Sequence, residues 1–290
     1  MYASAGDYSA DGPMRVQRHT NARIFNDRIV PALNPAEREN NLLLGAARRL
    51  AHSPDDGAFM ASVEEDESVV CAALLVPPFN LLISPGPTTA LEALARQLQA
   101  WGIAIPGVMA LAPVSVAFAA LWQRVTQCGA ERGKELQLLA LGGAPTATLA
   151  PGVLRAAAGD DIPVLTAWGS AFFAEVGLPS AEHDLFVARL DEAIAAERLW
   201  LWESEGRPVS MLGYSETTAR AVRIGPVFTP REWRGRGFAS AAVAGLSLRL
   251  LTGGRFWCLL FANVDNPASA ALYRRIGYQD VCVYREYRFT

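Results

Sequence analysis

The sequence predicts an α/β protein with a mixed α+β sheet, divided into two domains. Short β-rich apolar runs alternate along the chain with stretches whose apolar residues recur at helical spacing. A chain of 290 residues is long enough for two domains that each bury a core. An apolar run at residues 221–229 is followed by a glycine turn and a helix-like stretch to about residue 250, an order typical of an anion-binding strand, turn and helix.

Composition and charge narrow the function classes. With 51% hydrophobic and 19% charged residues the chain is expected to be globular, and its net charge of -3 argues against a general nucleic-acid binder. The cysteines are widely spaced, form no Cys-x-x-Cys pair and are accompanied by only three histidines. We therefore expect reduced thiols, a cytoplasmic location and no metal site. The cysteines are Cys71, Cys128, Cys258 and Cys282.

Two segments bear on export and membranes. Residues 1–13 are rich in small and polar residues and lack the apolar core of a signal peptide, so a flexible tail is expected there. No charged residue occurs between Arg96 and Arg124, but Gly102, Pro106 and Pro113 break this stretch. It therefore predicts short elements and not a membrane span.

The first half of the chain, after the tail, predicts alternating helices and strands. Asn34-Pro35 should open a helix, and the acidic residues 64–67 should form the turn of a hairpin. Further helices are expected at 88–101 and 114–125, and strands at 59–63, 69–76, 79–83, 108–111 and 136–141. Residues 142–159, rich in Pro, Gly, Ala and Thr, are the best candidate for a linker.

The second half predicts the order helix, helix, three strands, helix, strand, helix, strand. Asn266-Pro267 is a cap followed by proline at the first helical position, and Gly277 should end that helix. The other helices are expected at 162–176, 182–197 and from Phe238, and the strands at 199–203, 209–215, 221–229, 256–262 and 281–289.

The turn between residues 229 and 238 carries the strongest chemical signal. Its two glycines can adopt positive φ and let successive N–H groups converge on an anion beside the positive end of the next helix. Two arginines add fixed positive charge, which suits a diphosphate. A plain surface turn is the alternative interpretation. The turn reads Arg234-Gly235-Arg236-Gly237-Phe238-Ala239-Ser240.

Arg234, Gly237 and Ala239 match the Arg/Gln-x-x-Gly-x-Gly/Ala signature of the GNAT acyltransferases, and the chain from there to Thr290 resembles that family. The resemblance implies two GNAT-like acyl-CoA acyltransferase domains, of which the C-terminal one is complete. The expected division is a tail at 1–13, a degenerate GNAT-like domain at 14–150 and a catalytic N-acetyltransferase domain at 151–290.

An internal repeat supports the tandem arrangement. Residues 117–125 match residues 268–276 at five positions of nine, and each window follows a short buried strand and precedes another. The first copy has Ser84-Pro85-Gly86-Pro87 in place of the Arg/Gly turn, and these prolines have no N–H to offer a phosphate. It also has Trp122 where the second copy has Tyr273. The first half is therefore expected to shape the substrate groove or to support the second half.

In the family that the chain resembles, the strand before the turn and the strand after the next helix splay apart around the pantetheine arm. Gly225-Pro226 favours such a break in the sheet. The resemblance implies that the backbone of Val227 and Thr229 binds the arm, that the Phe228 N–H polarises the thioester carbonyl, and that Tyr273 protonates the departing thiolate. Asn266 and Ser269 are expected to lie beside the arm on the helix that carries Tyr273. Packing is the alternative role of Tyr273, and capping is the alternative role of Asn266.

For the general base and for the acceptor pocket, the sequence offers several candidate residues. Glu203, Glu216 and Glu175 are candidates for the base, and a solvated surface carboxylate is the alternative for each. Phe172, Phe173, Trp200 and Trp202 are candidates for the pocket wall, and core packing is the alternative.

The resemblance implies an N-acetyltransferase that moves an acetyl group from acetyl-CoA to a primary amine of a small molecule or peptide by direct attack on the thioester. A non-catalytic acyl-CoA-binding sensor or assembly module, or a transferase for another acyl group, is the alternative. Acetyl-CoA and an amine are the expected partners, with no nucleic acid, membrane or metal. The sequence does not predict an oligomeric state.

Overall fold

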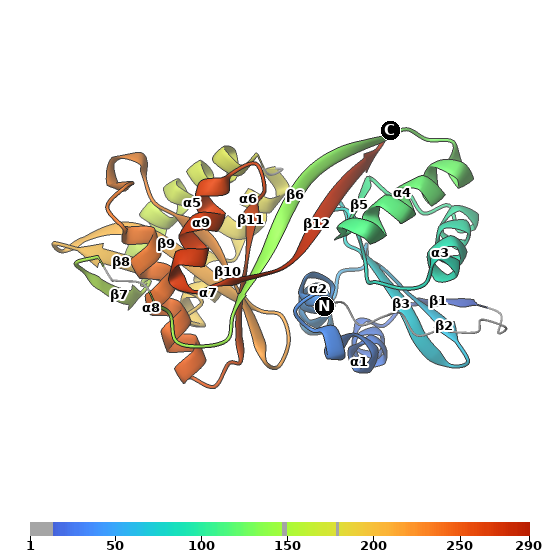
Figure 1. Cartoon of the computed structure of the whole chain (residues 1–290), viewed down its shortest axis with the longest axis horizontal. Coiled ribbons are helices and arrows are strands. Elements are labelled where there is room, and N and C mark those ends of the chain that lie inside the picture. Colours follow the sequence, from blue (N-terminus) through green and yellow to red (C-terminus); the bar gives the residue numbers. More distant parts are fainter. Residues whose placement is uncertain (1–13, 147–149, 178–179) are drawn as a thin grey trace.

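The computed structural model describes residues 14–146, 150–177 and 180–290, so the tail predicted at 1–13 lies outside the described residues. One mixed sheet of twelve strands runs through both halves of this part of the chain (Figure 1). Its strands follow the order β1-β2-β3-β4-β5-β12-β6-β11-β10-β9-β8-β7. The α/β fold with a mixed sheet is confirmed.

The first half supplies six strands and four α-helices within the described residues. They are β1 (Arg15–His19), α1 (Ala22–Leu33), α2 (Asn41–His52), β2 (Phe59–Glu65), β3 (Ser68–Leu75), β4 (Leu81–Ile83), α3 (Thr88–Ala100), β5 (Gly107–Leu111), α4 (Ala112–Thr126) and β6 (Ala130–Leu141).

The helix predicted from Asn34 begins later than expected, because Asn34–Ala36 is a single 3-10 turn and the helix itself, α2, starts at Asn41. The start of α1 is fixed by the Asn21 side chain, which accepts hydrogen bonds from the amides of Arg23 and Ile24 at 3.0 Å.

The second half supplies the remaining elements. They are β7 (Val153–Ala156), α5 (Ile162–Val176), α6 (Ser180–Ala188), α7 (Leu190–Ala195), β8 (Leu199–Ser204), β9 (Arg207–Glu216), β10 (Ala221–Phe228), α8 (Phe238–Thr252), β11 (Trp257–Asn263), α9 (Pro267–Ile276) and β12 (Gln279–Phe289). Two predictions need correction. The expected linker contains β7, which pairs with β8, and the helix expected at 182–197 is divided into α6 and α7 at Arg189.

The two halves exchange their last strands. β12, the end of the chain, lies between β5 of the first half and β6, whereas β6 lies between β12 and β11 of the second half. Figure 1 shows β6 in green and β12 in red as a twisted ribbon that joins the halves. Hydrogen bonding of the sheet is therefore continuous between the halves, and the division of the chain at residue 150 stays a prediction.

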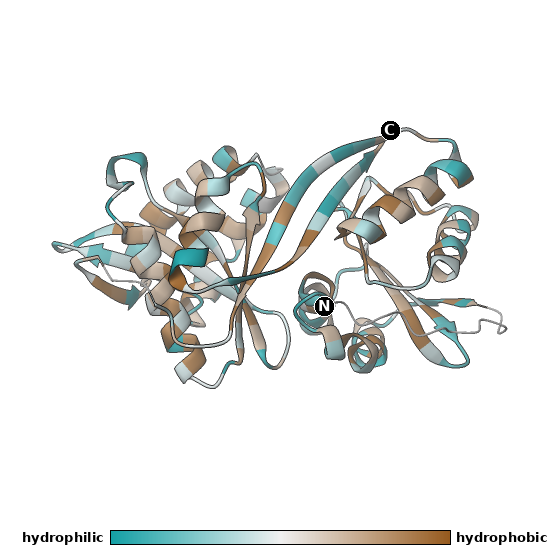
Figure 2. Cartoon of the chain, viewed as in Figure 1, coloured by the Kyte–Doolittle hydropathy of each residue, from teal (hydrophilic) through white to brown (hydrophobic). Residues whose placement is uncertain are grey.

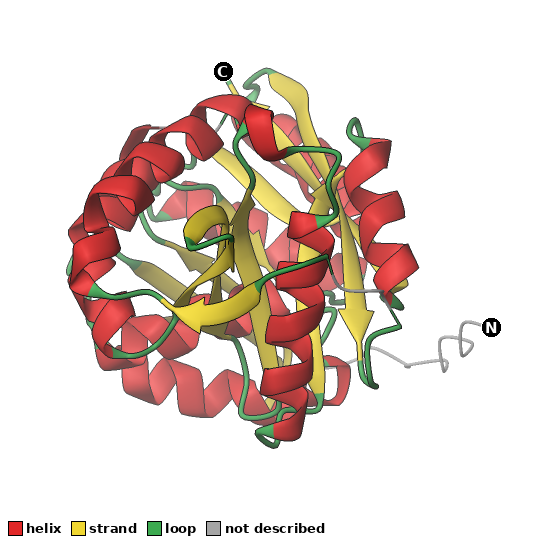
Figure 3. Cartoon of the chain, turned by 90° about the vertical axis from the view of Figure 1, so that its left-hand side faces the viewer, coloured by secondary structure: helices red, strands yellow, loops and turns green. Residues whose placement is uncertain are grey.

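Helices lie on both faces of the sheet (Figure 3). α8 and α9 bury one apolar face of the second half, where Val222, Ile224 and Leu260 lie, and α5–α7 bury the opposite face near Leu201 and Met211. Figure 2 shows brown strands where the helices cover them and a mostly teal outer part of the β6–β12 ribbon. Within the described ranges, every helix is too short or too polar to cross a lipid bilayer.

Candidate functional site

The sheet splits between β10 and β11. These strands pair in parallel only at Ala221 with Trp257, Val222 with Cys258 and Arg223 with Leu259. The register of β10 against β9 then shifts between Ile224 and Val227, on either side of Gly225-Pro226. The break expected from that dipeptide is confirmed: beyond Arg223 the edges of β10 and β11 that face each other are unpaired in the described structure.

The glycine turn after β10 presents backbone donors. Gly235 and Gly237 have φ of 76° and 82°, a region that favours glycine, and Gly237 is the N-cap of α8 without a side-chain hydrogen bond at the cap. The amides of residues 235–240 donate no hydrogen bond to any other described residue. The turn therefore places a row of N–H groups that have no acceptor among the described residues at the positive end of a 15-residue helix.

The two arginines of the turn have different surroundings. Arg234 donates to the Thr229 carbonyl at 2.8 Å and binds the Glu175 carboxylate at 2.8 and 2.9 Å, so it ties the turn to α5. The guanidinium of Arg236 lies 4.9 Å from the Trp233 ring centre and forms no ion pair with a described residue. Arg236 is therefore the better placed of the two for a phosphate.

The end of β10 is held by side chains of neighbouring elements. Phe228 is 7% exposed and packs against Trp168 of α5, with ring centres 6.3 Å apart. The Ser210 hydroxyl donates to the Phe228 carbonyl at 3.0 Å and lies 2.9 Å from the Thr229 hydroxyl. Val227 packs partly under α8, on the opposite side of β10.

Helix α9 carries the predicted acid. The Asn266 side chain caps this helix by accepting from the Ser269 amide at 3.4 Å, so the capping role weighed for Asn266 is present. Tyr273 is 9% exposed, its ring centre lies 6.1 Å from that of Tyr278, and its hydroxyl bonds no other described residue. Burial raises the pKa of Tyr273 to about 12, so the phenol is protonated at neutral pH.

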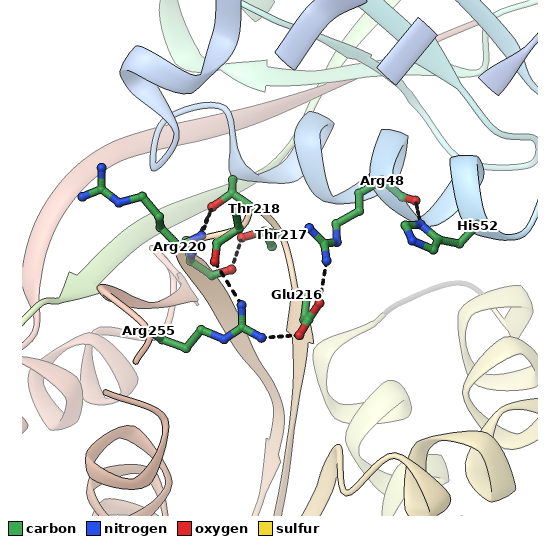
Figure 4. Close-up of polar contacts among 9 residues, drawn as sticks. Arg48, His52, Glu216, Thr217, Thr218, Arg220 and Arg255 are labelled. Atoms are coloured by element: carbon green, nitrogen blue, oxygen red, sulfur yellow. Dashed lines mark hydrogen bonds and ion pairs between the residues drawn. The ribbon is translucent and has the colours of Figure 1, made fainter. Parts of the chain in front are cut away.

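The three candidate bases all sit in ion pairs. Glu203 accepts from Arg155 at 2.6 Å, and Glu175 binds Arg234 as described above. Glu216 at the end of β9 accepts from Arg48 of α2 at 2.8 Å and also from Arg255 (Figure 4). These pairings favour structural roles, so the assignment of a base among the three glutamates stays a prediction.

The aromatic candidates fall into two groups. Trp200 and Trp202 lie in the core under α8, where they are 6% and 2% exposed, and their indole N–H groups donate to backbone carbonyls. Both residues therefore pack in the core, which was the alternative to lining the pocket. Phe172 and Phe173 lie on α5, and Phe173 contacts Phe186 of α6. Only this second group lies on the face of the sheet opposite α8.

The equivalent position in the first half is filled by protein. Ser84 is 1% exposed and accepts from the Ala72 amide, and a Cβ on Gly86 would lie 2.7 Å from the Val70 carbonyl oxygen. Trp122, in the place of Tyr273, packs between Phe118 and Phe289. These contacts agree with the expected degeneracy of this half.

Comparison with known families identifies the second half. The sequence model of the acetyltransferase (GNAT) family matches residues 165–278, which span the split strands, the turn and Tyr273. Residues 165–278 belong to the GNAT acetyltransferase family. A search of curated protein sequences finds no match for the chain.

Solved structures are similar in fold to nearly the whole chain, including the first half. A GCN5-related N-acetyltransferase from Sphaerobacter thermophilus is 19% identical with a TM-score of 0.62, and covers 95% of this chain and 96% of its own. A GNAT-family acetyltransferase from Colwellia psychrerythraea is 11% identical, with a TM-score of 0.57 and coverage of 95% and 98%. A tandem GNAT protein from the clavulanic acid biosynthesis pathway is 14% identical, with a TM-score of 0.55 and coverage of 94% and 98%. These TM-scores and coverages show a shared fold over both halves.

One residue at the GNAT split was missed by the sequence reasoning. Arg223 is the last residue of β10 that pairs with β11, and the only charged residue in the strand. Its signal was present in the sequence, because an arginine interrupts the otherwise apolar run of residues 221–228.

Proposed function

We propose that the protein is an acetyl-CoA-dependent N-acetyltransferase acting on a primary amine. The observation that carries the proposal combines two features: β10 and β11 are unpaired beyond Arg223, and the amides of residues 235–240 at the end of this split have no acceptor among the described residues. These amides and Arg236 fit a pyrophosphate, and the unpaired strand edges fit the amide groups of a pantetheine arm. Acetyl-CoA supplies the thioester, and the backbone groups of Val227 and Thr229 are the proposed partners of the arm.

In the reaction, the amine nitrogen forms a bond to the acetyl carbon, the carbon–sulfur bond breaks, the nitrogen loses a proton and the sulfur gains one. A backbone N–H at the end of β10 that faces the split is the proposed donor to the thioester oxygen as negative charge develops there. The strand register directs the Phe228 N–H toward Met211 of β9 instead, so the expected role of Phe228 is not part of this proposal. Tyr273 is the proposed source of the proton for sulfur, because its hydroxyl bonds no other described residue.

A phenol with a raised pKa is a weak acid, and the same burial acts on the thiol. Burial raises the pKa of the Cys71 and Cys258 thiols to about 12, the value reached by Tyr273. A dry site would raise the basicity of a departing thiolate in the same direction, so burial of both groups favours transfer of the proton from Tyr273 to sulfur once the thiolate forms.

The proton lost by the amine has no assigned acceptor. Glu203, Glu216 and Glu175 each neutralise an arginine, and of these Glu216 lies nearest in sequence to the split strand. We propose that the amine is bound in its neutral form or loses its proton to water, with Glu216 as the one carboxylate to be tested as a base.

Two measurements test this function together. Isothermal titration should show binding of acetyl-CoA. A separate titration with free adenosine, which lacks the pyrophosphate and the arm, should show none. Release of the CoA thiol should then be followed with a panel of primary amines. Binding with no turnover across the panel would support the acyl-CoA sensor instead, whereas no binding of acetyl-CoA or CoA would refute both functions. The same assay with longer acyl-CoA thioesters tests the acyl preference.

A further inference from the structure

Arg223 lies on the face of the split opposite the cofactor helix. Its neighbours Val222 and Ile224 point into the core under α8, whereas Ala221 and the paired Leu259 belong to the core on the other face. Because side chains alternate along a strand, Arg223 lies on the face of Ala221 and Leu259. Nη1 of Arg223 donates a long hydrogen bond of 3.5 Å to Asn41 of α2, which is fully buried. The first half of the chain therefore holds this guanidinium in place.

The opening of the sheet begins beside this residue. Arg223 forms the last pair of β10 with β11, and Gly225, two residues further, is exposed. An arm whose pyrophosphate lies at residues 235–240 enters the split from the Phe228 end and points its thioester toward Arg223. On the face away from α8, an approaching amine therefore passes the guanidinium as it reaches the carbonyl.

The surroundings of Arg223 are positively charged. α2 and the preceding residues meet the β9–β10 turn along a seam that carries five arginines and three glutamates among the described residues, a formal balance of +2. Figure 4 shows Arg48, Arg220, Arg255 and Glu216 of this set. The arginines are Arg38, Arg48, Arg220, Arg223 and Arg255, and the glutamates are Glu37, Glu39 and Glu216. Such a balance attracts anions and repels cationic polyamines.

We propose that the acceptor is an amine that carries a carboxylate, and that Arg223 binds this carboxylate. An arginine presents a planar fork of donors that matches a carboxylate, and in a half-buried position such a charge-assisted contact both positions the ligand and selects it. The inference rests on the proposed acetyl transfer and adds the chemical class of the acceptor. Arg223 is a specificity residue that contacts the acceptor at the end remote from its amine.

The test compares three forms of each acceptor in the thiol-release assay. These are α- and ω-amino acids of increasing chain length, their carboxamides, and the amines of equal length without the carboxyl group. Wild-type protein should prefer the acids in kcat/KM. The preference is informative because a carboxamide makes the neighbouring amine more acidic, so more of it is neutral at pH 7, and intrinsic reactivity would favour the carboxamide.

Arg223→Met should lower kcat/KM for the preferred acid by about 10- to 100-fold, as expected for a lost charge-assisted hydrogen bond, and leave turnover of the matched uncharged amine within about threefold. Arg223→Lys should restore part of the loss. Arg249→Met, which removes an equal charge from the exposed side of α8, is the matched control and should behave as wild type. Affinity for acetyl-CoA, measured by titration, should be the same in all these variants and shows that each is folded.

The outcomes separate this inference from the proposed function. Turnover of amines without a preference for the acids, or an Arg223→Met variant that loses acids and amines alike, would overturn the carboxylate assignment and leave acetyl transfer intact. If wild-type protein acetylates no member of any of the three sets, acetyl transfer to small amines fails and this assignment fails with it.

Discussion

Arg48 of α2 donates a hydrogen bond of 2.8 Å to Glu216 of β9, across 168 residues of sequence and between the two halves of the chain. Arg255, which follows α8, binds the other oxygen of the same carboxylate. Between these residues α2 approaches the turn closely, since a Cβ on Gly45 would lie 3.1 Å from Cγ2 of Thr217. One carboxylate thus joins the first half of the chain to the strand that leads into the split and to the end of α8.

Glu216→Gln separates the structural role of this carboxylate from the catalytic one. If Glu216 acts as a link, the substitution should lower the free energy of unfolding by about 1 kcal/mol, because the group is partly exposed and the neighbouring arginines lose one shared charge. The activity per folded molecule should then fall less than threefold. Urea unfolding and thiol release measure the two effects. Unchanged stability with a loss of turnover above 100-fold would instead make Glu216 the base.

Tyr273→Phe tests the proposed acid directly. The hydroxyl bonds no other described residue, so its removal leaves no buried partner unsatisfied, and the ring contact with Tyr278 is kept. We expect kcat to fall by about 100-fold, within the range of general acid catalysis, while the Kd for acetyl-CoA changes less than twofold. Tyr278→Phe is the contrasting variant: its hydroxyl lies 2.8 Å from that of Ser247, so it should cost stability and spare kcat. Equal activity of Tyr273→Phe and wild type would remove Tyr273 from the mechanism.

The pH dependence of the reaction follows from the pKa of the same tyrosine. Since burial raises that pKa to about 12, we expect Tyr273 to keep its proton up to about pH 10. The profile of kcat/KM should therefore rise with pH as the amine loses its proton and should show no descending limb up to about pH 10. A fall in kcat/KM between pH 8 and 10 that disappears in Tyr273→Phe would show that the phenol ionises earlier than its burial predicts.

Local features of the site were predictable because each depends on neighbouring residues. Gly225-Pro226 indicated the break in β10, Asn266-Pro267 the start of α9, and Gly235 and Gly237 the turn, and all of these are present. β7 was missed because its four residues contain an arginine and lie among turn-forming residues; the strand is held by pairing with β8 and by Arg155, which binds Asp161 and Glu203.

Contacts between distant parts of the chain were not predictable in the same way. The exchange of β6 and β12 depends on the choice of strand partners, which alternation of side chains does not encode. The same limit applies to the carboxylates: Glu175, Glu203 and Glu216 are candidates from their positions in the chain, but their arginine partners come from other elements. The face of the sheet on which Arg223 lies became known only from the strand register and from its contact with α2.

A buried histidine in the first half should make the protein sensitive to acid. His19 is 8% exposed, Nε2 lies 2.8 Å from the Ser62 hydroxyl, and that hydroxyl donates to Glu64 at 3.0 Å. Burial is the main cause that lowers the pKa of His19 below 6.5, against the opposing effect of Glu64. The unfolded state then binds the proton more readily, so stability is lost as pH falls from about 6.5 toward the lower folded pKa.

His19→Gln checks this origin of the acid sensitivity, because the amide can still donate to Ser62 but does not titrate. The urea concentration at the midpoint of unfolding should decrease for wild type as the pH is lowered from 7.5 to 5.5, and it should decrease less for His19→Gln. The comparison stays above pH 5 because the pKa of Glu64 is lowered, chiefly by its hydrogen bond with Arg28, and this carboxylate contributes a second loss only at lower pH. Identical pH dependence in both proteins would place the sensitivity elsewhere.

Gly235→Ala tests the glycine turn as the pyrophosphate site, and the chain offers a matched control. Gly235 has a φ of 76°, and no described atom lies within 4 Å of the position that a Cβ would take there; Gly206 in the β8–β9 turn has a φ of 72° and equally open surroundings. Alanine at either position should cost about 1 kcal/mol of stability, because a Cβ disfavours the left-handed region. Only Gly235→Ala should also weaken acetyl-CoA binding, by about 10-fold or more, since strain that shifts φ at residue 235 turns the following amides away from a common point. Titration of both variants with acetyl-CoA and with a CoA analogue that lacks the pyrophosphate gives the comparison. A pyrophosphate bound elsewhere would leave the two alanine variants equal in affinity, and this result would separate the turn from the cofactor.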